Sequence, residues 1–298
     1  MRHLQNFEMI RRIERAGSIR KAAADMHITP SALNRQLNQF ERELGAQIFE
    51  RLPRGVRLNA EGELFLQHIR AQLADLARVR SQIDDHRALR RGRVSIACSQ
   101  ALQPYFLPRA IAQFRRRHPQ VTFATYVRDR AAAEEDLAKF HSDLALVFEP
   151  VYMVDFEILA AIPQRIHAVM RADHPLSEER EIRLAACLDR TYLMPNQAYG
   201  VRDLLEQAAR RMQRRLSPAI EADSFDLMCH YVLEEEAIAF QIPVGLDPAA
   251  LPGMVHRPLA EADVPAGSLI LGQAKGRSLP VASHAFAKDL AAAMDQLA

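Results

Sequence analysis

The sequence holds few cysteines and no pattern that would pair them or bind a metal. The three cysteines, an odd number, lie far apart at Cys98, Cys187 and Cys229, and no Cys-x-x-Cys occurs. A disulfide framework or a zinc site is therefore not expected. The eleven histidines likewise show no His-Glu-x-x-His or other ligand spacing. We predict no bound metal and no cofactor.

Long apolar runs and catalytic motifs are also missing. No apolar run approaches the ~20 residues that a membrane-spanning helix needs, and the chain begins with an amphipathic segment instead of a signal peptide. We therefore expect no membrane contact and a cytoplasmic location. An enzyme is disfavoured because the sequence has no Gly-x-Gly-x-x-Gly after a strand, no Walker loop and no Gly-x-Ser-x-Gly elbow.

Charge is distributed unevenly along the 298 residues. Residues 1–92 contain 17 Lys and Arg against 11 Asp and Glu, whereas the remainder contains 22 against 26. The N-terminal part therefore has a formal charge of +6 and the remainder one of −4. Phosphate binding requires an excess of positive charge. The distribution favours a nucleic-acid-binding element near the N-terminus.

The stretch that begins at Gly17 predicts a short helix at 18–25, a second helix at 30–44 and a two-stranded ribbon with an Arg-Gly tip at about 48–58. Ser18 and Thr29 can each accept a hydrogen bond from the first helical turn, and Pro30 suits the first position of a helix. Gly17 stands where a left-handed residue would end the preceding helix. A helix pair followed by such a ribbon is a winged helix-turn-helix.

The two faces of the segment 30–44 differ in chemistry. Its leucines and Phe40 recur every three or four residues, which places them on one stripe facing a core. The opposite face carries short hydrogen-bonding side chains and an arginine, as does a helix that enters the major groove of DNA. A merely solvated face is the alternative, and the capped helix pair with its Arg-tipped ribbon argues against it. We expect Asn34 and Arg35 to contact bases, with Ser31 and Asn38 beside them, and Arg51, Arg54 and Arg57 to contact phosphates.

A long helix is expected from the cap Asn59 to about His86. Its apolar residues follow a heptad pattern that Arg80 interrupts, at Leu66, Leu73, Leu76, Ile69 and Ile83. A long helix with a narrow apolar stripe needs a partner, which is either its own chain or a second copy. We favour self-association, because a dimer places two recognition helices at two half-sites.

Strands and helices alternate after the predicted hinge at residues 90–92. Strands are expected at about 93–98, 121–127, 143–148, 164–170, 192–194, 220–222, 237–242, 254–259 and 268–273. The first three, separated by helices, predict a parallel sheet with right-handed crossovers. Two such α/β lobes leave a cleft in which small ligands bind. A free-standing solute-binding protein shares this architecture, but the missing signal peptide and the basic N-terminal part disfavour it.

The segments AGSIRKAAADMHITPSALNRQL, ELGAQIFER and LNAEG closely resemble the winged helix-turn-helix of LysR-type transcriptional regulators. The later segments GRVSIACS, DLALVFEP and AIAFQIP match the effector half of that family more loosely. The resemblance implies an α/β protein with a DNA-binding domain at 1–58, a linker or dimerisation helix and hinge at 59–91, and an effector-binding domain of periplasmic-binding-protein type at 92–298. Lobe I of that domain is expected at about 92–162 and 267–298, and lobe II at about 163–266.

The same resemblance implies a sequence-specific DNA-binding regulator of transcription whose activity responds to a small molecule bound between the two lobes. It further implies a dimer-based tetramer on a dyad-symmetric operator, and contact with RNA polymerase if the protein is an activator. The sequence departs from the family at Thr29-Pro30-Ser31 and at Asn34, where relatives often have Gln-Pro and Ser. The family's base preference therefore does not carry over.

Matching motifs place an effector site on the loops that follow the strands. Ser99 and Gln100 open a helix whose free N–H groups suit an anion. Arg128 and Phe148 are expected to line the same lobe, and the other lobe is expected to contribute Asn196, Tyr199 and Arg202. We hypothesise a small anionic effector held by Ser99, Gln100 and one of the two arginines. For each arginine, a place on a solvated loop is the alternative.

Cys98 ends the first strand of the effector half, beside this predicted cleft. One alternative is a redox-sensing thiol, as in the peroxide-sensing members of the family. We favour a buried structural cysteine, because no resolving cysteine stands at a recognisable spacing and no basic neighbour in sequence lowers its pKa.

Overall fold

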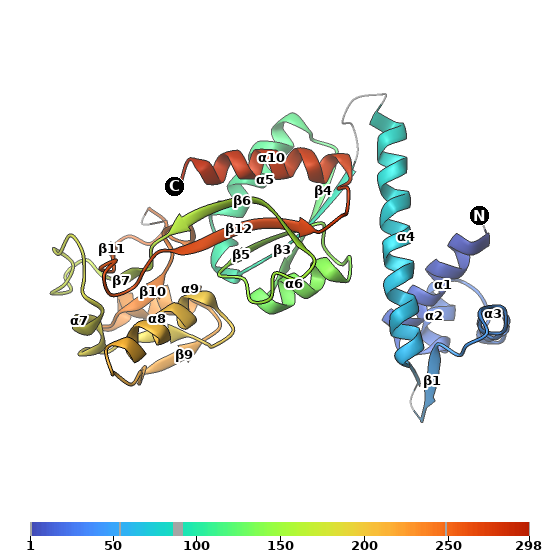
Figure 1. Cartoon of the computed structure of the whole chain (residues 1–298), viewed down its shortest axis with the longest axis horizontal. Helices are drawn as coiled ribbons and strands as arrows, with labels where there is room; N and C mark the ends of the chain where they lie inside the picture. The colour runs from blue at the N-terminus through green and yellow to red at the C-terminus, as the bar shows by residue number, and fades with distance from the viewer. Residues whose placement is uncertain (1, 54, 86–91, 248, 298) are drawn as a thin grey trace. The chain divides into compact units, whose positions relative to one another are not determined.

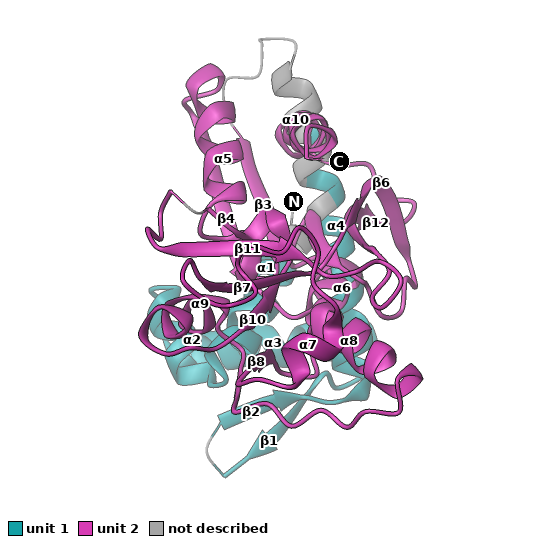
Figure 2. Cartoon of the chain, turned by 90° about the vertical axis from the view of Figure 1, so that its left-hand side faces the viewer, with its two compact units in different colours: residues 1–79 teal, residues 80–298 magenta. Residues whose placement is uncertain are grey.

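The computed structural model describes residues 2–53, 55–85, 92–247 and 249–297 (Figure 1). The chain forms two compact units, residues 1–79 and 80–298, which Figure 2 colours separately. Each unit has its own hydrophobic core. The division falls inside one long helix, and the domain boundaries predicted after residues 58 and 91 stay predictions. Residues 90 and 91 of the predicted hinge lie outside the described part of the chain.

The described part of the N-terminal unit consists of helices and one ribbon, namely α1 (Arg2–Ala16), α2 (Ile19–Asp25), α3 (Pro30–Leu44), β1 (Phe49–Leu52), β2 (Gly55–Leu58) and the first part of α4 (Ala60–Asp85). The side chains of Ser18, Thr29 and Asn59 accept hydrogen bonds from the first turns of α2, α3 and α4, as predicted. Gly17 ends α1 with a φ of 61°, the left-handed conformation expected of it. The predicted winged helix-turn-helix is confirmed.

The apolar stripe of α4 begins inside the core of this unit. Leu66 and Ile69 are buried there with Leu33 and Ile10, and Leu73 packs partly against them. The first turns of α4 therefore pack against their own chain, which is the alternative to the favoured self-association. The side chain of Ile83, at the far end of the predicted stripe, lies outside the described residues.

Hydrogen bonds fasten the ribbon to the helices. The carboxylate of Glu41, on α3, accepts from the backbone N–H of Ile48 at 2.9 Å and of Phe49 at 3.3 Å. On the other strand, the N–H of Val56 donates to the carbonyl of Gly17 at 3.0 Å. The ribbon is therefore held at both strands, and its position relative to α3 is set by the chain itself.

We predict that Glu41→Ala lowers the free energy of unfolding by about 1–3 kcal/mol, because two partly buried N–H groups lose their acceptor. Glu43→Ala is the matched control, since Glu43 is exposed and bonds only to the side chain of Gln39 among the described residues. Urea unfolding of the full chain measures both. Equal effects of the two substitutions would contradict the assigned role of Glu41.

The C-terminal unit is built on a five-stranded sheet in the order β4-β3-β5-β12-β6. Its elements in chain order are β3 (Gly92–Cys98), η1 (Gln100–Leu102), α5 (Phe106–Arg117), β4 (Val121–Val127), α6 (Arg130–Ala138), β5 (Leu144–Phe148), β6 (Phe156–Gln164), β12 (Gly267–Ala274) and α10 (Val281–Asp295). β3 pairs in parallel with β4 and β5, as predicted, whereas β12 pairs antiparallel with β5 and β6. The sheet is therefore mixed.

Helices cover both faces of this sheet, with α5 and α10 on one side and α6 on the other (Figure 1). Because successive strand residues face opposite sides, Ile96 and Leu146 enter the larger core, whereas Ala97 and Val147 enter the smaller core under α6. Central strands buried on both faces explain why β3 and β5 are almost continuously apolar.

The second lobe of this unit has two smaller sheets, in the orders β10-β7-β11 and β8-β9. Its elements are β7 (His167–Arg171), α7 (Leu184–Leu188), β8 (Leu193–Pro195), α8 (Gly200–Arg211), β9 (Ile220–Ala222), α9 (Phe225–Glu234), β10 (Ala239–Gln241), η2 (Pro243–Gly245) and β11 (Met254–Pro258). The chain enters this lobe after β6 and returns to the five-stranded sheet at β12. The predicted two-lobed α/β architecture is confirmed.

One strand prediction was wrong. The expected strand at 164–170 is two strands, because β6 ends at Gln164 and β7 begins at His167, in a different sheet. Most of β6 was not predicted at all. Among the described strands, β6 pairs only with β12 and is an edge strand. Its apolar run at 158–162 is short, and periodicity alone does not distinguish such a run from a helix segment. Its residue Ile158 is 50% exposed.

A histidine pair makes the stability of this lobe depend on pH. The Nδ1 atoms of His167 and His256 lie 2.8 Å apart. Burial, together with the neighbouring His256, lowers the pKa of His167 from its usual 6.5 to about 4. The unfolded chain therefore binds this proton at a higher pH than the folded chain does.

We predict that the free energy of unfolding falls as the pH drops from about 6.5 to about 4, and that His167→Gln reduces this slope in acid titrations followed by circular dichroism. An unchanged slope would contradict the assignment.

Candidate functional site

The outward face of α3 presents the side chains predicted to contact DNA. Ser31, Arg35 and Asn38 are exposed, and Asn34 is half-buried. Within the described residues, Arg35 has no ion-pair or hydrogen-bond partner for its guanidinium group, whereas Ser31 lies 3.2 Å from the hydroxyl of Thr29. The guanidinium of Arg35 is therefore free to bind an external ligand.

The ribbon adds a second arginine to this face. Nη2 of Arg51 donates to Oδ1 of Asn34 at 2.9 Å. The bond joins a residue predicted to contact a base, Asn34, to one predicted to contact a phosphate, Arg51. Arg57 forms an ion pair with Glu50, its partner on the other strand of the ribbon. These two residues lie on the opposite face of the ribbon from Arg51. Arg54, also predicted to contact phosphate, lies outside the described residues.

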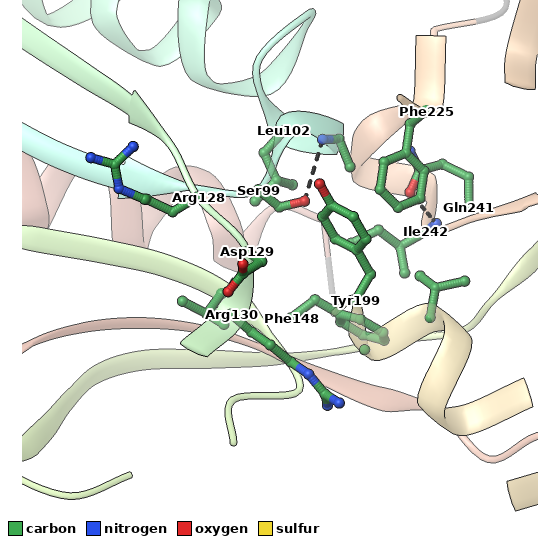
Figure 3. A pocket seen from close by; sticks show the side chains of 14 residues that line it. Ser99, Leu102, Arg128, Asp129, Arg130, Phe148, Tyr199, Phe225, Gln241 and Ile242 are labelled. Carbon is green, nitrogen blue, oxygen red and sulfur yellow. Dashed lines mark hydrogen bonds between the residues drawn. The ribbon is translucent and has the colours of Figure 1, made fainter. Parts of the chain in front are cut away.

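A pocket lies between the two lobes of the C-terminal unit (Figure 3). Four of the predicted effector-site residues line it, namely Ser99, Arg128, Phe148 and Tyr199. The cavity measures about 20 Å³, room for about one water molecule. The structure therefore leaves little free space in this pocket, and a larger ligand requires the residues that line it to move apart.

The other three predicted residues do not line the pocket. Gln100 connects the lobes instead: its Oε1 accepts from the N–H of Phe225 at 2.8 Å, and its Nε2 donates to Asp226 at 3.0 Å. Asn196 accepts from the N–H of its near neighbour Ala198 at 3.0 Å. The helix predicted to open at Ser99 is only the three-residue 3-10 helix η1.

Arg202 has a structural environment. Its side chain is buried, and its guanidinium donates to Glu206 at 2.7 Å and to Glu221 at 2.9 Å. Both carboxylates belong to the same lobe as Arg202. The structure therefore does not bring Arg202 to the predicted effector, because its charge is compensated elsewhere.

The two arginines that line the pocket also turn their guanidinium groups away from it (Figure 3). Arg128 donates to Asp136 at 2.8 Å. Arg130 donates to the carbonyl of Glu149 at 3.1 Å and to Asp203, on the other lobe, at 3.3 Å. Both guanidinium groups are therefore bound within the chain, and the contact of an arginine with an anion stays a prediction.

The start of a helix is among the polar features that line the pocket. α8 begins at the pocket with Tyr199, Gly200 and Val201, and the side chain of Tyr199 does not cap it. The hydroxyl of Tyr199 donates instead to the carbonyl of Asp223 at 3.2 Å. Burial is the main cause that raises the pKa of Tyr199. The first N–H groups of α8 are therefore the donors available to a ligand.

Other lining residues were missed by sequence reasoning. Asp129 and Arg130 are the second and third residues after β4, a position from which they could have been found. Phe225 and Gln241 come from the second lobe, and no local signal in the sequence shows which of its residues face the first. The lobes approach each other closely at Gly200, where an added Cβ would lie 2.6 Å from the carbonyl oxygen of Phe148.

The environment of Cys98 fits the structural alternative. Its side chain is fully buried, and Nε2 of Gln103 lies 3.6 Å from its sulfur. Burial raises the pKa of the Cys98 thiol to about 11, so that it is protonated at neutral pH. Across the described ranges, we find neither a cluster of three metal-binding side chains nor a helix able to span a membrane.

Comparison with known proteins agrees with both units. Residues 4–63 match the family model "Bacterial regulatory helix-turn-helix protein, lysR family", and residues 87–295 match "LysR substrate binding domain". The RuBisCO operon transcriptional regulator of Allochromatium vinosum is 30% identical over 207 residues, which cover 70% of this chain and 67% of that protein.

Solved structures agree with the fold of the whole chain. A full-length OxyR variant from Pseudomonas aeruginosa is 20% identical with a TM-score of 0.77, and the match covers 96% of this chain and 94% of that one. Full-length CbnR in complex with its target DNA is 16% identical with a TM-score of 0.66, over 97% and 99% of the two chains. On the evidence of the two family models, the chain belongs to the LysR family of DNA-binding transcriptional regulators, with a helix-turn-helix domain and a substrate-binding domain.

Proposed function

We propose that this regulator reads its operator through the outward face of α3, with Arg35 as a base-contacting residue. The observation that carries the proposal is the exposed guanidinium of Arg35, which the described residues leave without a partner on a face of short polar side chains. An arginine in the major groove typically contacts O6 and N7 of guanine. The complex of the similar CbnR with its target DNA supports this use of the fold.

A second part of the proposal concerns assembly and location. Two copies would place two α3 helices on a dyad-symmetric operator, and two dimers would form the tetramer that the family resemblance implies. The part of α4 beyond the core of the N-terminal unit is the segment we assign to self-association. Because bacterial DNA lies in the cytoplasm, we propose that the protein acts there and contacts RNA polymerase if it is an activator.

A third part concerns the effector. We assign it to the pocket between the lobes, as a small molecule whose acceptor group, such as a carboxylate, binds Ser99 and the first N–H groups of α8. The family description "LysR substrate binding domain" supports a small-molecule site in this unit. An anion fits the uncapped start of α8, and apolar side chains such as Phe148, Phe225 and Ile242 fit the body of the molecule.

We expect Arg35→Ala to weaken binding to the specific operator by about 1–3 kcal/mol while changing binding to random DNA much less. Arg54→Ala is expected to weaken binding to all sequences alike, because a phosphate contact carries no sequence information. Filter binding to DNA upstream of the protein's own gene, over a range of salt concentrations, separates the two effects. Equal losses on specific and random DNA for Arg35→Ala would mean that Arg35 contacts only phosphate.

Gly200→Ala tests the effector site. The added Cβ would lie 2.6 Å from the carbonyl oxygen of Phe148 and from Cβ of Glu149. Because Gly200 and Phe148 both line the pocket, the added methyl group occupies space beside the N–H groups assigned to the ligand. A thermal-shift screen of small organic acids, amino acids and aromatic compounds on the wild-type chain identifies ligands. We predict that these ligands raise the melting temperature of Gly200→Ala much less than that of the wild type.

Arg202→Ala is the control for that screen. Loss of this buried guanidinium lowers the melting temperature of the free protein, because Glu206 and Glu221 lose their partner. The ligand-induced shift is expected to remain. A ligand-induced shift that survives Gly200→Ala but disappears in Arg202→Ala would contradict the assignment of the pocket.

A further inference from the structure

We propose that Asn34 and Arg51 act as one unit that selects a guanine in the operator. This selection rests on the DNA-binding function proposed above and names the base that this part of the surface reads. It follows from the contact between the recognition helix and the ribbon, where Nη2 of Arg51 lies 2.9 Å from Oδ1 of Asn34. In the sequence analysis, Arg51 was expected to contact phosphate only.

The chemistry of this contact fixes the orientation of the Asn34 amide. A guanidinium group has five N–H donors and no acceptor. The atom of Asn34 that faces Arg51 must therefore be the amide oxygen, as the structure has it. The amide NH₂ group of Asn34 then remains available, and it is a donor.

A pair that offers mainly donors distinguishes between the purines. An asparagine that reads adenine uses its oxygen and its NH₂ group together, toward N6 and N7 of the base. The oxygen of Asn34 already accepts one hydrogen bond from Arg51, whose other N–H donors lie beside it, where the N6 donor of adenine would have to approach. The pair offers the NH₂ group of Asn34 and the remaining N–H groups of Arg51. Guanine presents two acceptors, N7 and O6, in the major groove, whereas adenine presents a donor at N6. Guanine is therefore the purine that the pair fits.

The fold of the N-terminal unit fixes the position of Arg51. Arg51 pairs in register with Val56, which packs partly against the hydrophobic core and donates its N–H to Gly17. Arg57 lies on the opposite face of the ribbon. The face that carries Arg51 is therefore the one held against the helices. Arg51 is exposed and Asn34 half-buried, so that the pair is open to DNA.

The test is selection of binding sites from randomised DNA by the purified full-length chain and its variants. The wild type is expected to select guanine at one position of each half-site. Asn34→Ala and Arg51→Ala are each expected to lose the preference for guanine over adenine at that same position, roughly tenfold or more. The double variant is expected to lose no more than either single variant, because the two residues act together.

Two further variants separate this role from charge and from folding. Arg51→Lys keeps the positive charge but loses the planar fork, so we expect it to lose the base preference and to keep its affinity for random DNA. Glu43→Ala, in the last turn of α3, is expected to leave the preference unchanged. Thermal unfolding of every variant checks that the N-terminal unit is folded.

Selection of adenine at this position, or effects of the two single variants at different positions, would overturn the proposal and leave the DNA-reading function intact. A wild-type chain that selects no sequence at all would overturn both. A preference that Arg51→Lys retains would also overturn the proposal, because charge alone would then explain the contribution of Arg51.

Discussion

The attachment of the ribbon to the recognition helix is the constraint on which the DNA-binding face depends. A single carboxylate, that of Glu41, accepts two backbone N–H groups at the start of the ribbon, while the second strand is tied to the end of α1 through Gly17. Together with the burial of Phe49 and Leu58 in the same core as α3, these bonds set the position of the ribbon's arginines. With them, a helix face and a ribbon become one surface.

The C-terminal unit follows a different principle, in which two lobes meet around a small cavity. The lobes approach each other closely where Gly200 lies against Phe148. Gln100 also joins them, because both the oxygen and the NH₂ group of its side chain bind the start of α9. Such contacts hold the lobes closed around a cavity of about 20 Å³. A small molecule that enters must replace some of these contacts. The energy of binding is thereby coupled to the relative position of the lobes.

Local signals in the sequence were sufficient for most of the DNA-binding unit. The caps Ser18, Thr29 and Asn59 and the apolar stripe of α3 act within a few residues of chain, so their spacing predicts both the helices and the inward face. The hydrogen bond between Arg51 and Asn34 could not be predicted in the same way. It depends on how the ribbon folds back, which the pattern of either segment alone does not contain.

The candidate effector site was predicted less completely, for a related reason. Ser99, Phe148 and Tyr199 follow strands or begin helices, and such positions can be recognised along the chain. Motif matching places Arg202 at the site, yet two carboxylates of its own lobe bind it. Glu206 lies four residues along the same helix, a spacing that the sequence shows, whereas Glu221 is brought to Arg202 by the three-dimensional packing of β9. The same holds for β6, an edge strand whose pairing with β12 joins segments about a hundred residues apart.

The most direct test of the central claim is chemical interference on bound DNA. Guanines of the DNA that binds this protein would be methylated at N7, which faces the major groove, and the methylated molecules that still bind would be sequenced. If α3 and the ribbon of two copies read the operator, the methylations that block binding should form two clusters about one helical turn, or a multiple of it, apart. Binding that N7 methylation does not impair at any guanine would contradict the account.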